Sequence, residues 1–450
     1  MVLGFRVNRV CLLKESMVVL EIRKAIIRFI YRMIPIVKPI TSVILSDKGK
    51  KKLKKFFLST TSSGGHRASN LLPNSPMIEG INLIGYSRAE MGIGESCRIA
   101  ANSISAAGIP FGIINFQGTS SARMEDLTWL SKEIKYPIYK INVFHINAEQ
   151  MPELNVRYND LLFKDRYNIG VWHWELPDFP EDWTDSFQYV DEIWAPSTFV
   201  AQALAIKSPV PVIKIPHSIE VTIKEYRDRK YYDLPENSFL FLTMYDVRSY
   251  QERKNPEASI NAFKISFEPD DMSVGLVIKV NSYRSKSNEF LKLKSMIEGY
   301  RNIYIINETL SRNDVNALLN VCDSFISLHR SEGFGLGLAE AMYLGKPAIG
   351  TNWSSTTDFM NYDNSCLVKY TLVHPTRDFG PYKAYQYWAE PDINHASEFM
   401  KKLVDDNKFY TDIGSEGQTF IKKYYSPSSV GQEISKRLKY IGKWKFGGGI

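Results

Sequence analysis

Short apolar runs alternate with stretches of helical periodicity from residue 81 onward. A short apolar run indicates a buried strand, and apolar positions three and four residues apart indicate a helix. This alternation is typical of parallel sheets covered by helices. The expected strands span 81–86, 113–116, 141–145, 168–172, 192–195 and 211–216, followed by a second series at 239–243, 275–280, 303–306, 324–328 and 348–351.

The polar, charged segment 226–236 separates the two series of strands. A chain of 450 residues also exceeds what one hydrophobic core usually serves, so two domains are expected. We predict Rossmann-like α/β domains at 79–225 and 237–425 that face each other across a cleft. No short-period repeat is present in the sequence, which argues against a solenoid.

The first 60 residues differ from the rest of the chain in charge. They hold 14 Lys or Arg against 3 Asp or Glu, whereas the whole chain carries a net charge of only +7. The remainder is therefore slightly acidic, and we do not expect it to bind nucleic acid. The basic segment has neither an uncharged run long enough to span a bilayer nor a signal-peptide cleavage site. We predict a basic extension over residues 1–78 whose residues 1–60 contact an anionic membrane surface; a solvated leader without that contact is the alternative.

Two carboxylates lie eight positions apart in the segment 331–347. Gly333 and Gly335 allow a tight turn, and the apolar spacing that follows predicts a helix. Glu332 is therefore expected at the N-terminus of this helix, with Glu340 about two turns further in, where the helix start can face an anionic ligand. The alternative is that one glutamate is a helix cap and the other an exposed surface residue.

A second group of charged residues precedes a predicted helix that begins with Asn255 as N-cap and Pro256 at its first position. Arg248 and Lys254 flank the loop before this helix, and Arg253 competes with them for the same role. Cations at a helix N-terminus can neutralise a diphosphate leaving group. Simple solvation at the surface is the alternative for each of them.

Aromatic and polar residues follow the predicted strand 168–172. The sequence Trp-His-Trp-Glu over residues 172–175 lies at the end of a strand that we expect to face the cleft. The aromatic side chains could form a floor for a sugar, with His173 and Glu175 contacting its hydroxyls. His173 is the first candidate and His145, at the end of the preceding strand, the second; a packed core histidine is an equally good interpretation for each.

Gly92 and Gly94 are expected between the first strand and its helix, where backbone N–H groups can bind phosphate. The third glycine of the dinucleotide-binding motif is missing, which argues against an NAD dehydrogenase. The four cysteines are scattered, without metal-ligand or disulfide spacing, and suit a reducing cytoplasm.

The two-glutamate segment resembles the E-x7-E motif of retaining family 4 glycosyltransferases. The order of elements agrees with that family from about residue 80 to residue 442. One departure is the segment 351–358, where many family members have a Gly-Gly loop ending in Glu. Three further segments resemble a polysaccharide-assembly branch of the family: 250–256, 327–330 and 388–392.

The resemblance implies a role for each candidate residue. Glu340 would accept hydrogen bonds from the donor ribose, and Glu332 would orient a hydroxyl of the donor sugar. Arg248 and Lys254 would stabilise the departing diphosphate, and His173 would be the active-site histidine. Other positions implied at the donor, phosphate or acceptor sites are Gly333, Phe334, Gly335, Arg253, Gly92 and Gly94, with His145, Glu175, His329 and Arg330 as second choices.

The resemblance also implies the GT-B fold, in which the second domain binds a nucleotide-diphosphate sugar and the first binds a glycan or lipid-linked acceptor. The last helix, within residues 426–450, would cross back to the first domain. Transfer would retain the anomeric configuration and need no cofactor, and the absence of any Asp-x-Asp pair predicts no bridging metal. We expect the protein in the cytoplasm, peripheral at the inner face of the membrane.

Two other functions share this fold. A nucleotide-sugar epimerase would use the same diphosphate site without an acceptor, and a catalytically silent scaffold would keep the fold while docking to a membrane.

Overall fold

The computed structural model describes residues 77–118, 122–281 and 288–447, apart from the side chains of Arg248 and Glu289. The basic extension that the sequence predicts, with its membrane-binding residues 1–60, lies outside these ranges. Among the helices of the described ranges, none combines the length and apolar character needed to cross a bilayer.

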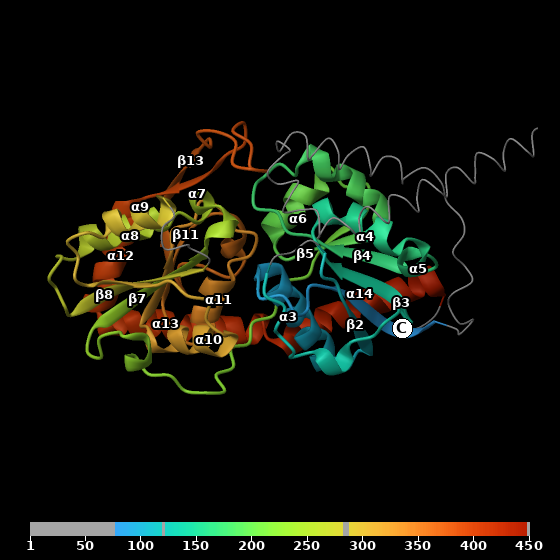
Figure 1. The fold of residues 1–450 in the computed structure, drawn as a ribbon, viewed down its shortest axis with the longest axis horizontal. Coiled ribbons are helices and arrows are strands. Elements are labelled where there is room, and N and C mark those ends of the chain that lie inside the picture. The colour runs from blue at the N-terminus through green and yellow to red at the C-terminus, as the bar shows by residue number, and fades with distance from the viewer. Residues whose placement is uncertain (1–76, 119–121, 282–287, 448–450) are drawn as a thin grey trace, which may run out of the picture.

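A parallel six-stranded sheet forms the first domain, in the order β2-β1-β3-β4-β5-β6 (Figure 1). Its strands are buried on both faces by helices, which is why they appear in the sequence as continuous apolar runs. The strands are β1 (Ile78–Gly85), β2 (Phe111–Asn115), β3 (Tyr139–His145), β4 (Tyr167–Val171), β5 (Glu192–Ala195) and β6 (Val212–Lys214), and the helices are α3 (Gly92–Ala106), α4 (Met151–Tyr158), α5 (Asp160–Phe163) and α6 (Thr198–Ala205).

The second domain repeats this architecture in the order β12-β11-β10-β7-β8-β9. The strands are β7 (Phe239–Asp246), β8 (Val274–Asn281), β9 (Ile303–Ile306), β10 (Ser324–Ser327), β11 (Ala348–Thr351) and β12 (Cys366–Val368). The helices are α7 (Gln251–Lys254), α8 (Pro256–Ser266), α9 (Asn288–Met296), α10 (Arg312–Val321), α11 (Leu336–Tyr343), α12 (Ile393–Asp405) and α13 (Asn407–Tyr424). The two-domain α/β architecture predicted from the sequence is confirmed.

All eleven predicted strands are present, but three were missed. One is the edge strand β12; the other two form an antiparallel hairpin, β13 (Tyr370–Val373) and β14 (Trp388–Pro391). The connecting segment 226–236 is packed against the second domain rather than free. Arg229 donates to the carboxylate of Asp323 at 2.7 Å and to the carbonyl of Val321 at 2.9 Å.

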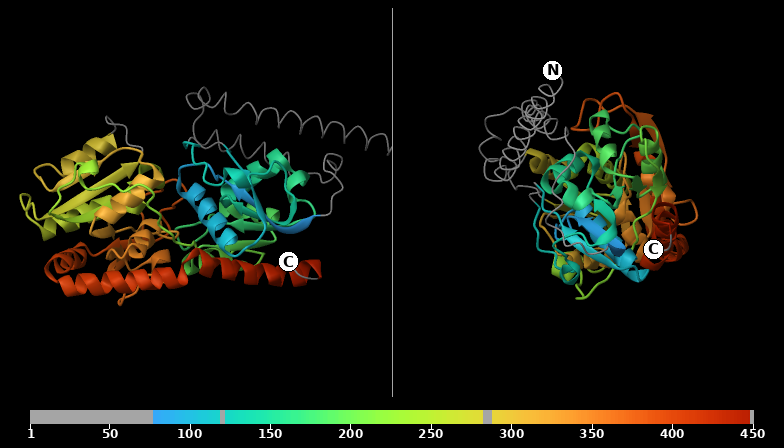
Figure 2. Two further views of the ribbon diagram at one scale, coloured as in Figure 1. Left: turned by 90° about the horizontal axis from the view of Figure 1, so that it is seen from below. Right: turned by 90° about the vertical axis from the view of Figure 1, so that its right-hand side faces the viewer.

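The last two helices connect the two domains. α13 packs on the second domain, and α14 (Pro427–Phe446) continues beneath the first (Figure 2). Ser426 caps α14 and Pro427 is its first residue, so the chain redirects between the two helices. The apolar face of α14 joins the core of the first domain through Val430, Ile434, Leu438 and Ile441.

Strand order places the site. In each sheet, the connections leave two neighbouring strands in opposite directions, between β1 and β3 in the first domain and between β7 and β10 in the second. Open parallel sheets bind ligands in the crevice beyond the carboxyl ends of such strands. The segments that follow β1, β3, β7 and β10 are therefore the expected walls of a binding cleft.

Candidate active site

A cleft of about 490 Å³ lies between the two domains. Its walls come from the segments that follow β1, β3, β7 and β10, as the strand order predicts, and also from those that follow β4 and β6. Lining residues from the first domain include Met91, Gly92, Ile93, Asn147, His173, Glu175 and His217, and those from the second include Asp246, Ser249, Arg253, Lys254, Glu332, Gly333, Phe334, Gly335 and Glu340.

The two-glutamate segment turns at Gly335, which is the N-cap of α11. Its φ angle is +98°, and a side-chain carbon there would lie 2.6 Å from Thr356 Cγ2, so glycine is required. Glu332, expected at the N-terminus of this helix, lies in the loop four residues before α11 begins. Glu340 is on the helix, and both carboxylates line the cleft.

Glu332 is buried and paired with two cations. Its Oε1 accepts from Lys254 Nζ, and its Oε2 lies 3.3 Å from Arg253 Nη1. Its backbone N–H donates to Ser354 Oγ at 2.9 Å, which fixes the loop. Burial alone would raise the pKa of Glu332, but Lys254 and Arg253 lower it to about 2. Glu332 is therefore a charged carboxylate held inside the cleft.

Glu340 is buried in a different environment. Its Oε1 pairs with Arg312, whose Nε also lies 3.5 Å from Glu95 of α3 in the first domain. Burial raises the pKa of Glu340 despite this cation. The surface interpretation of Glu340 is wrong, because only 4% of the residue is exposed. Arg312 was not predicted; it is the first residue of α10, and only the tertiary structure brings it to Glu340.

The cations predicted for the diphosphate lie on α7 and the turn before it. Arg253 is buried and donates to the carbonyl of Ser331 at 2.7 Å, in addition to its contact with Glu332. Arg248 is on the short 3₁₀ turn before α7, and its side chain lies outside the described part of the structure. Asn255 is the N-cap of α8 and Pro256 its first residue, as predicted, although the φ of Asn255 is +51° and its side chain makes no cap hydrogen bond.

A pair of histidines lines the wall formed by the first domain. His173 Nε2 lies 2.9 Å from His217 Nε2, and the two rings stack with centroids 5.1 Å apart. Burial lowers the pKa of His173 to about 4 and that of His217 well below its usual value. Both rings are therefore neutral near pH 7. His217 was missed, although it follows the last predicted strand of this domain; its ring also contacts Phe334, at 4.9 Å between centroids.

His145 is not brought to the cleft. It is buried, with its Nδ1 3.0 Å from Ser96 Oγ, and burial lowers its pKa to about 3. The second-choice histidine is thus a packed core residue.

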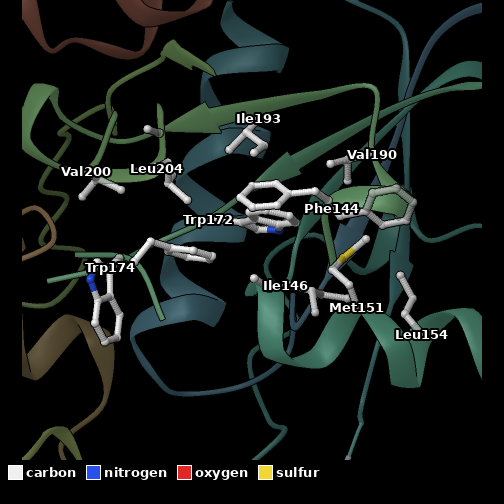
Figure 3. Packing of buried hydrophobic residues seen from close by; sticks show 14 of the residues in the cluster. Phe144, Ile146, Met151, Leu154, Trp172, Trp174, Val190, Ile193, Val200 and Leu204 are labelled. Carbon is white, nitrogen blue, oxygen red and sulfur yellow. The ribbon is translucent and has the colours of Figure 1, made fainter. Parts of the chain in front are cut away.

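The predicted sugar floor is wrong for the two tryptophans. Trp172 and Trp174 are buried in the core of the first domain, as Figure 3 shows, and Trp172 stacks on Phe179 with an angle of 5° between the rings. In this extended segment, alternate side chains point in opposite directions. The two tryptophans therefore face the core, whereas His173 and Glu175 face the cleft.

The two glycines of the first domain have different surroundings. They form the first turn of α3 rather than a loop before it. A side chain at Gly92 would meet nothing within 4 Å, and this residue lines the cleft. A side-chain carbon at Gly94 would overlap the carbonyl of Ala89. Gly92 is thus open to a ligand, and Gly94 permits close packing of the turn.

Two further second choices lie behind the cleft wall. His329 is fully buried, with its Nδ1 3.1 Å from the carbonyl of Ser327. Arg330 makes a two-pronged ion pair with Glu390 of β14, at 2.5 and 2.9 Å. Neither is among the described residues that line the cleft.

Within the described ranges, no group of three or more His, Cys, Asp or Glu residues is arranged to hold a metal ion.

Residues 227–369 match the family model of the glycosyl transferases group 1. The serotype-specific mannosyltransferase WbdA of Escherichia coli is 24% identical over 280 residues, which are 59% of this chain and 30% of that protein. This chain thus aligns with less than a third of the length of that relative.

Solved structures share the fold at low sequence identity. The sucrose-phosphate synthase of Thermosynechococcus elongatus has a TM-score of 0.59 at 12% identity, covering 81% of this chain and 99% of that one. A glycosyltransferase of Rickettsia africae has a TM-score of 0.58 at 13% identity, covering 82% and 100%. Anabaena Alr3699/HepE, solved with UDP and glucose, has a TM-score of 0.55 at 13% identity, covering 80% and 100%. The chain therefore has the GT-B fold, and its residues 227–369 are similar to the glycosyl transferases group 1.

Proposed function

We propose that this protein transfers a sugar from a nucleotide-diphosphate donor to a glycan or lipid-linked acceptor, with retention of the anomeric configuration, in the synthesis of a cell-surface polysaccharide. The observation that carries the proposal is the arrangement of Glu332, Lys254 and Arg253 in one cleft with Glu340. The group 1 match covers these residues, and the similarity to the mannosyltransferase WbdA supports a glycan substrate.

In this mechanism, the bond between the anomeric carbon and the diphosphate oxygen breaks, and the acceptor hydroxyl oxygen bonds to the same face of that carbon. The proton of the hydroxyl passes to the departing diphosphate. Negative charge grows on the departing diphosphate. Lys254 and Arg253 stabilise that charge from fixed positions, so little reorganisation is needed as the bond breaks. Glu332 holds both cations in place and accepts a hydrogen bond from the donor sugar.

Glu340 accepts hydrogen bonds from the ribose in the same proposal, sharing its carboxylate with Arg312. His173 acts as a neutral ring, because its lowered pKa keeps it unprotonated near pH 7. Its Nε2 is engaged by His217, which sets its orientation toward the substrate. The HepE complexes with UDP make UDP-sugars the first donors to test.

The proposal is tested with purified full-length protein and UDP-, GDP- and dTDP-sugars, with and without a lipid-linked glycan acceptor. We expect transfer only when acceptor is present, and none from the Glu332→Gln variant. Epimerisation of the donor sugar in the absence of acceptor would show that the protein is an epimerase and not a transferase. Failure to bind any nucleotide diphosphate would favour the silent scaffold.

We also propose that residues 1–60 bring the enzyme to the anionic inner face of the cytoplasmic membrane. Their excess of Lys and Arg supports this proposal, because each exposed cation near such a surface contributes about 1 kcal/mol. The full-length chain should sediment with phosphatidylserine vesicles at low salt and dissociate at high salt. Equal binding by a variant that lacks residues 1–60 would contradict this role.

A further inference from the structure

The hairpin missed by the sequence prediction joins the two domains. Its strands β13 and β14 belong to the second domain, but Tyr382 and Trp388 lie in the hydrophobic core of the first. The Tyr382 ring lies 5.5 Å from the ring of Trp174, between centroids. Figure 1 shows β13 at the top of the molecule, beside the gap between the sheets. We call residues 370–391 the strap.

A tight turn fixes the tip of the strap. Phe379 and Tyr382 exchange two backbone hydrogen bonds, at 2.8 and 3.0 Å. Gly380 lies between them with a φ of +59°, and a side chain there would overlap Tyr250 Oη. This close packing leaves Tyr382 only 5% exposed, so the position of its hydroxyl is well defined.

Two tyrosines of the strap bind the segment that follows His173. The hydroxyl of Tyr382 donates to Glu175 Oε2 at 2.9 Å, and the hydroxyl of Tyr385 donates to Asp178 Oδ2 at 2.6 Å. Both contacts are hydrogen bonds from a tyrosine hydroxyl to a carboxylate, but their locations differ. Glu175 lines the cleft, whereas the contact between Tyr385 and Asp178 is at the solvent-exposed surface.

The second oxygen of Glu175 points toward the proposed phosphate site. Its Oε1 lies 3.9 Å from Arg253 Nη2, while the Nη1 of the same guanidinium lies 3.3 Å from Glu332. A second carboxylate so close to Arg253 opposes the binding of a diphosphate, because like charges repel and because a tighter pair would neutralise the cation. The Tyr382 hydroxyl gives Glu175 a partner outside the residues that line the cleft.

We propose that Tyr382 is a positioning residue of the donor site, which holds the Glu175 carboxylate to one side so that Arg253 remains available to the donor diphosphate. The proposal rests on the glycosyltransferase function proposed above. The proposal also assigns a function to the strap, because the donor site is complete only when the strap is packed on the first domain. Without the hydroxyl, Glu175 turns onto Arg253 or toward the diphosphate, and either change weakens binding.

Two variants of the full-length chain separate this role from simple packing. Tyr382→Phe keeps the ring and removes the hydroxyl. We expect it to weaken nucleoside diphosphate binding about tenfold, because the freed Glu175 carboxylate competes with the diphosphate for Arg253. Glu175→Gln removes the charge that Tyr382 holds. The double variant should therefore bind as well as Glu175→Gln alone. Tyr385→Phe removes the matched exposed hydroxyl and should bind like the parent.

Binding is measured by calorimetry with UDP, GDP and dTDP, alongside melting temperatures. If the parent binds a nucleotide and Tyr382→Phe binds it equally well, the inference fails while the proposed function stands. If Tyr382→Phe and the double variant are equally weak, the Tyr382 hydroxyl does not act through Glu175 and the inference also fails. If the parent binds none of the three nucleotides, the proposed function fails and the inference fails with it.

Discussion

The two glutamates of the cleft are eight residues apart in sequence but differ in electrostatic surroundings. Glu332 has two cations from α7, and its pKa is lowered to about 2. Glu340 shares one arginine with Glu95 of the other domain, and its pKa is raised by burial. Glu332 is therefore an anion whose charge is balanced by two cations, whereas the charge of Glu340 is balanced by only one arginine that it shares. This difference suits Glu332 to hold charges in place and Glu340 to accept hydrogen bonds from a neutral group such as a ribose.

Apart from the loss of transfer expected of Glu332→Gln, the largest expected effect comes from removing a cation that is paired with Glu332. Lys254→Ala should lower turnover by about 10²–10³-fold while changing nucleoside diphosphate affinity much less, because charge on the leaving group grows toward the transition state. Steady-state kinetics and calorimetry measure the two quantities. Lys292→Ala, which removes an exposed ion pair with Glu257, is the matched control.

Because Lys254→Ala leaves Glu332 with Arg253 alone, its melting temperature must be measured as well. A folded Lys254→Ala variant with parental turnover would show that the cation is not used in catalysis.

Glu340→Gln tests the other side of the comparison. It should weaken nucleoside diphosphate binding about ten- to a hundredfold, since a hydrogen bond to a charged acceptor contributes about 1.5–3 kcal/mol, and should change turnover at saturating donor less. Lys254→Ala should thus affect turnover more than affinity, and Glu340→Gln should affect affinity more than turnover. If both variants lose affinity and turnover in the same proportion, the division of roles between the two glutamates is wrong.

The two pKa shifts predict opposite dependences of stability on pH. The pKa of Glu332 is lowered on folding, so its contribution is present above its unfolded pKa, near 4.5, and is lost as pH falls toward 2. The pKa of Glu340 is raised, so ionising this group costs stability as pH rises above its unfolded value.

Glu332→Gln should therefore be less stable than the parent at pH 7, by a difference on the order of 3 kcal/mol that shrinks toward pH 3. For Glu340→Gln, the contribution from ionisation is opposite in sign, so its stability relative to the parent should improve from pH 4 to pH 7. Denaturant unfolding at several pH values measures both. A parallel pH dependence for the two variants would contradict the assigned environments.

The fold was predictable because buried parallel strands leave continuous apolar runs, such as 141–145 and 275–280. The cleft position of Glu332 and Glu340 followed from a motif in which glycine spacing encodes a turn. Trp172 was wrongly predicted to contact a sugar. An aromatic residue after a strand gives the same sequence pattern whether its side chain lines a cleft or packs in the core. His217, Arg312 and Tyr382 were missed because their partners lie 28 to 207 residues away and no local pattern records such contacts.

The smallest expected effect is that of metal removal. Both glutamates of the cleft are engaged by side-chain cations, Glu332 by Lys254 and Arg253 and Glu340 by Arg312. We therefore expect the positive charge that faces the diphosphate to come from the protein, and transfer to continue at the parental rate, within about twofold, after treatment with EDTA. Transfer assays with chelator, followed by addition of Mg²⁺ or Mn²⁺, measure this. Loss of activity in EDTA that either ion restores would mean that a metal ion binds the diphosphate. The side-chain cations beside the two glutamates would then not be sufficient to neutralise it.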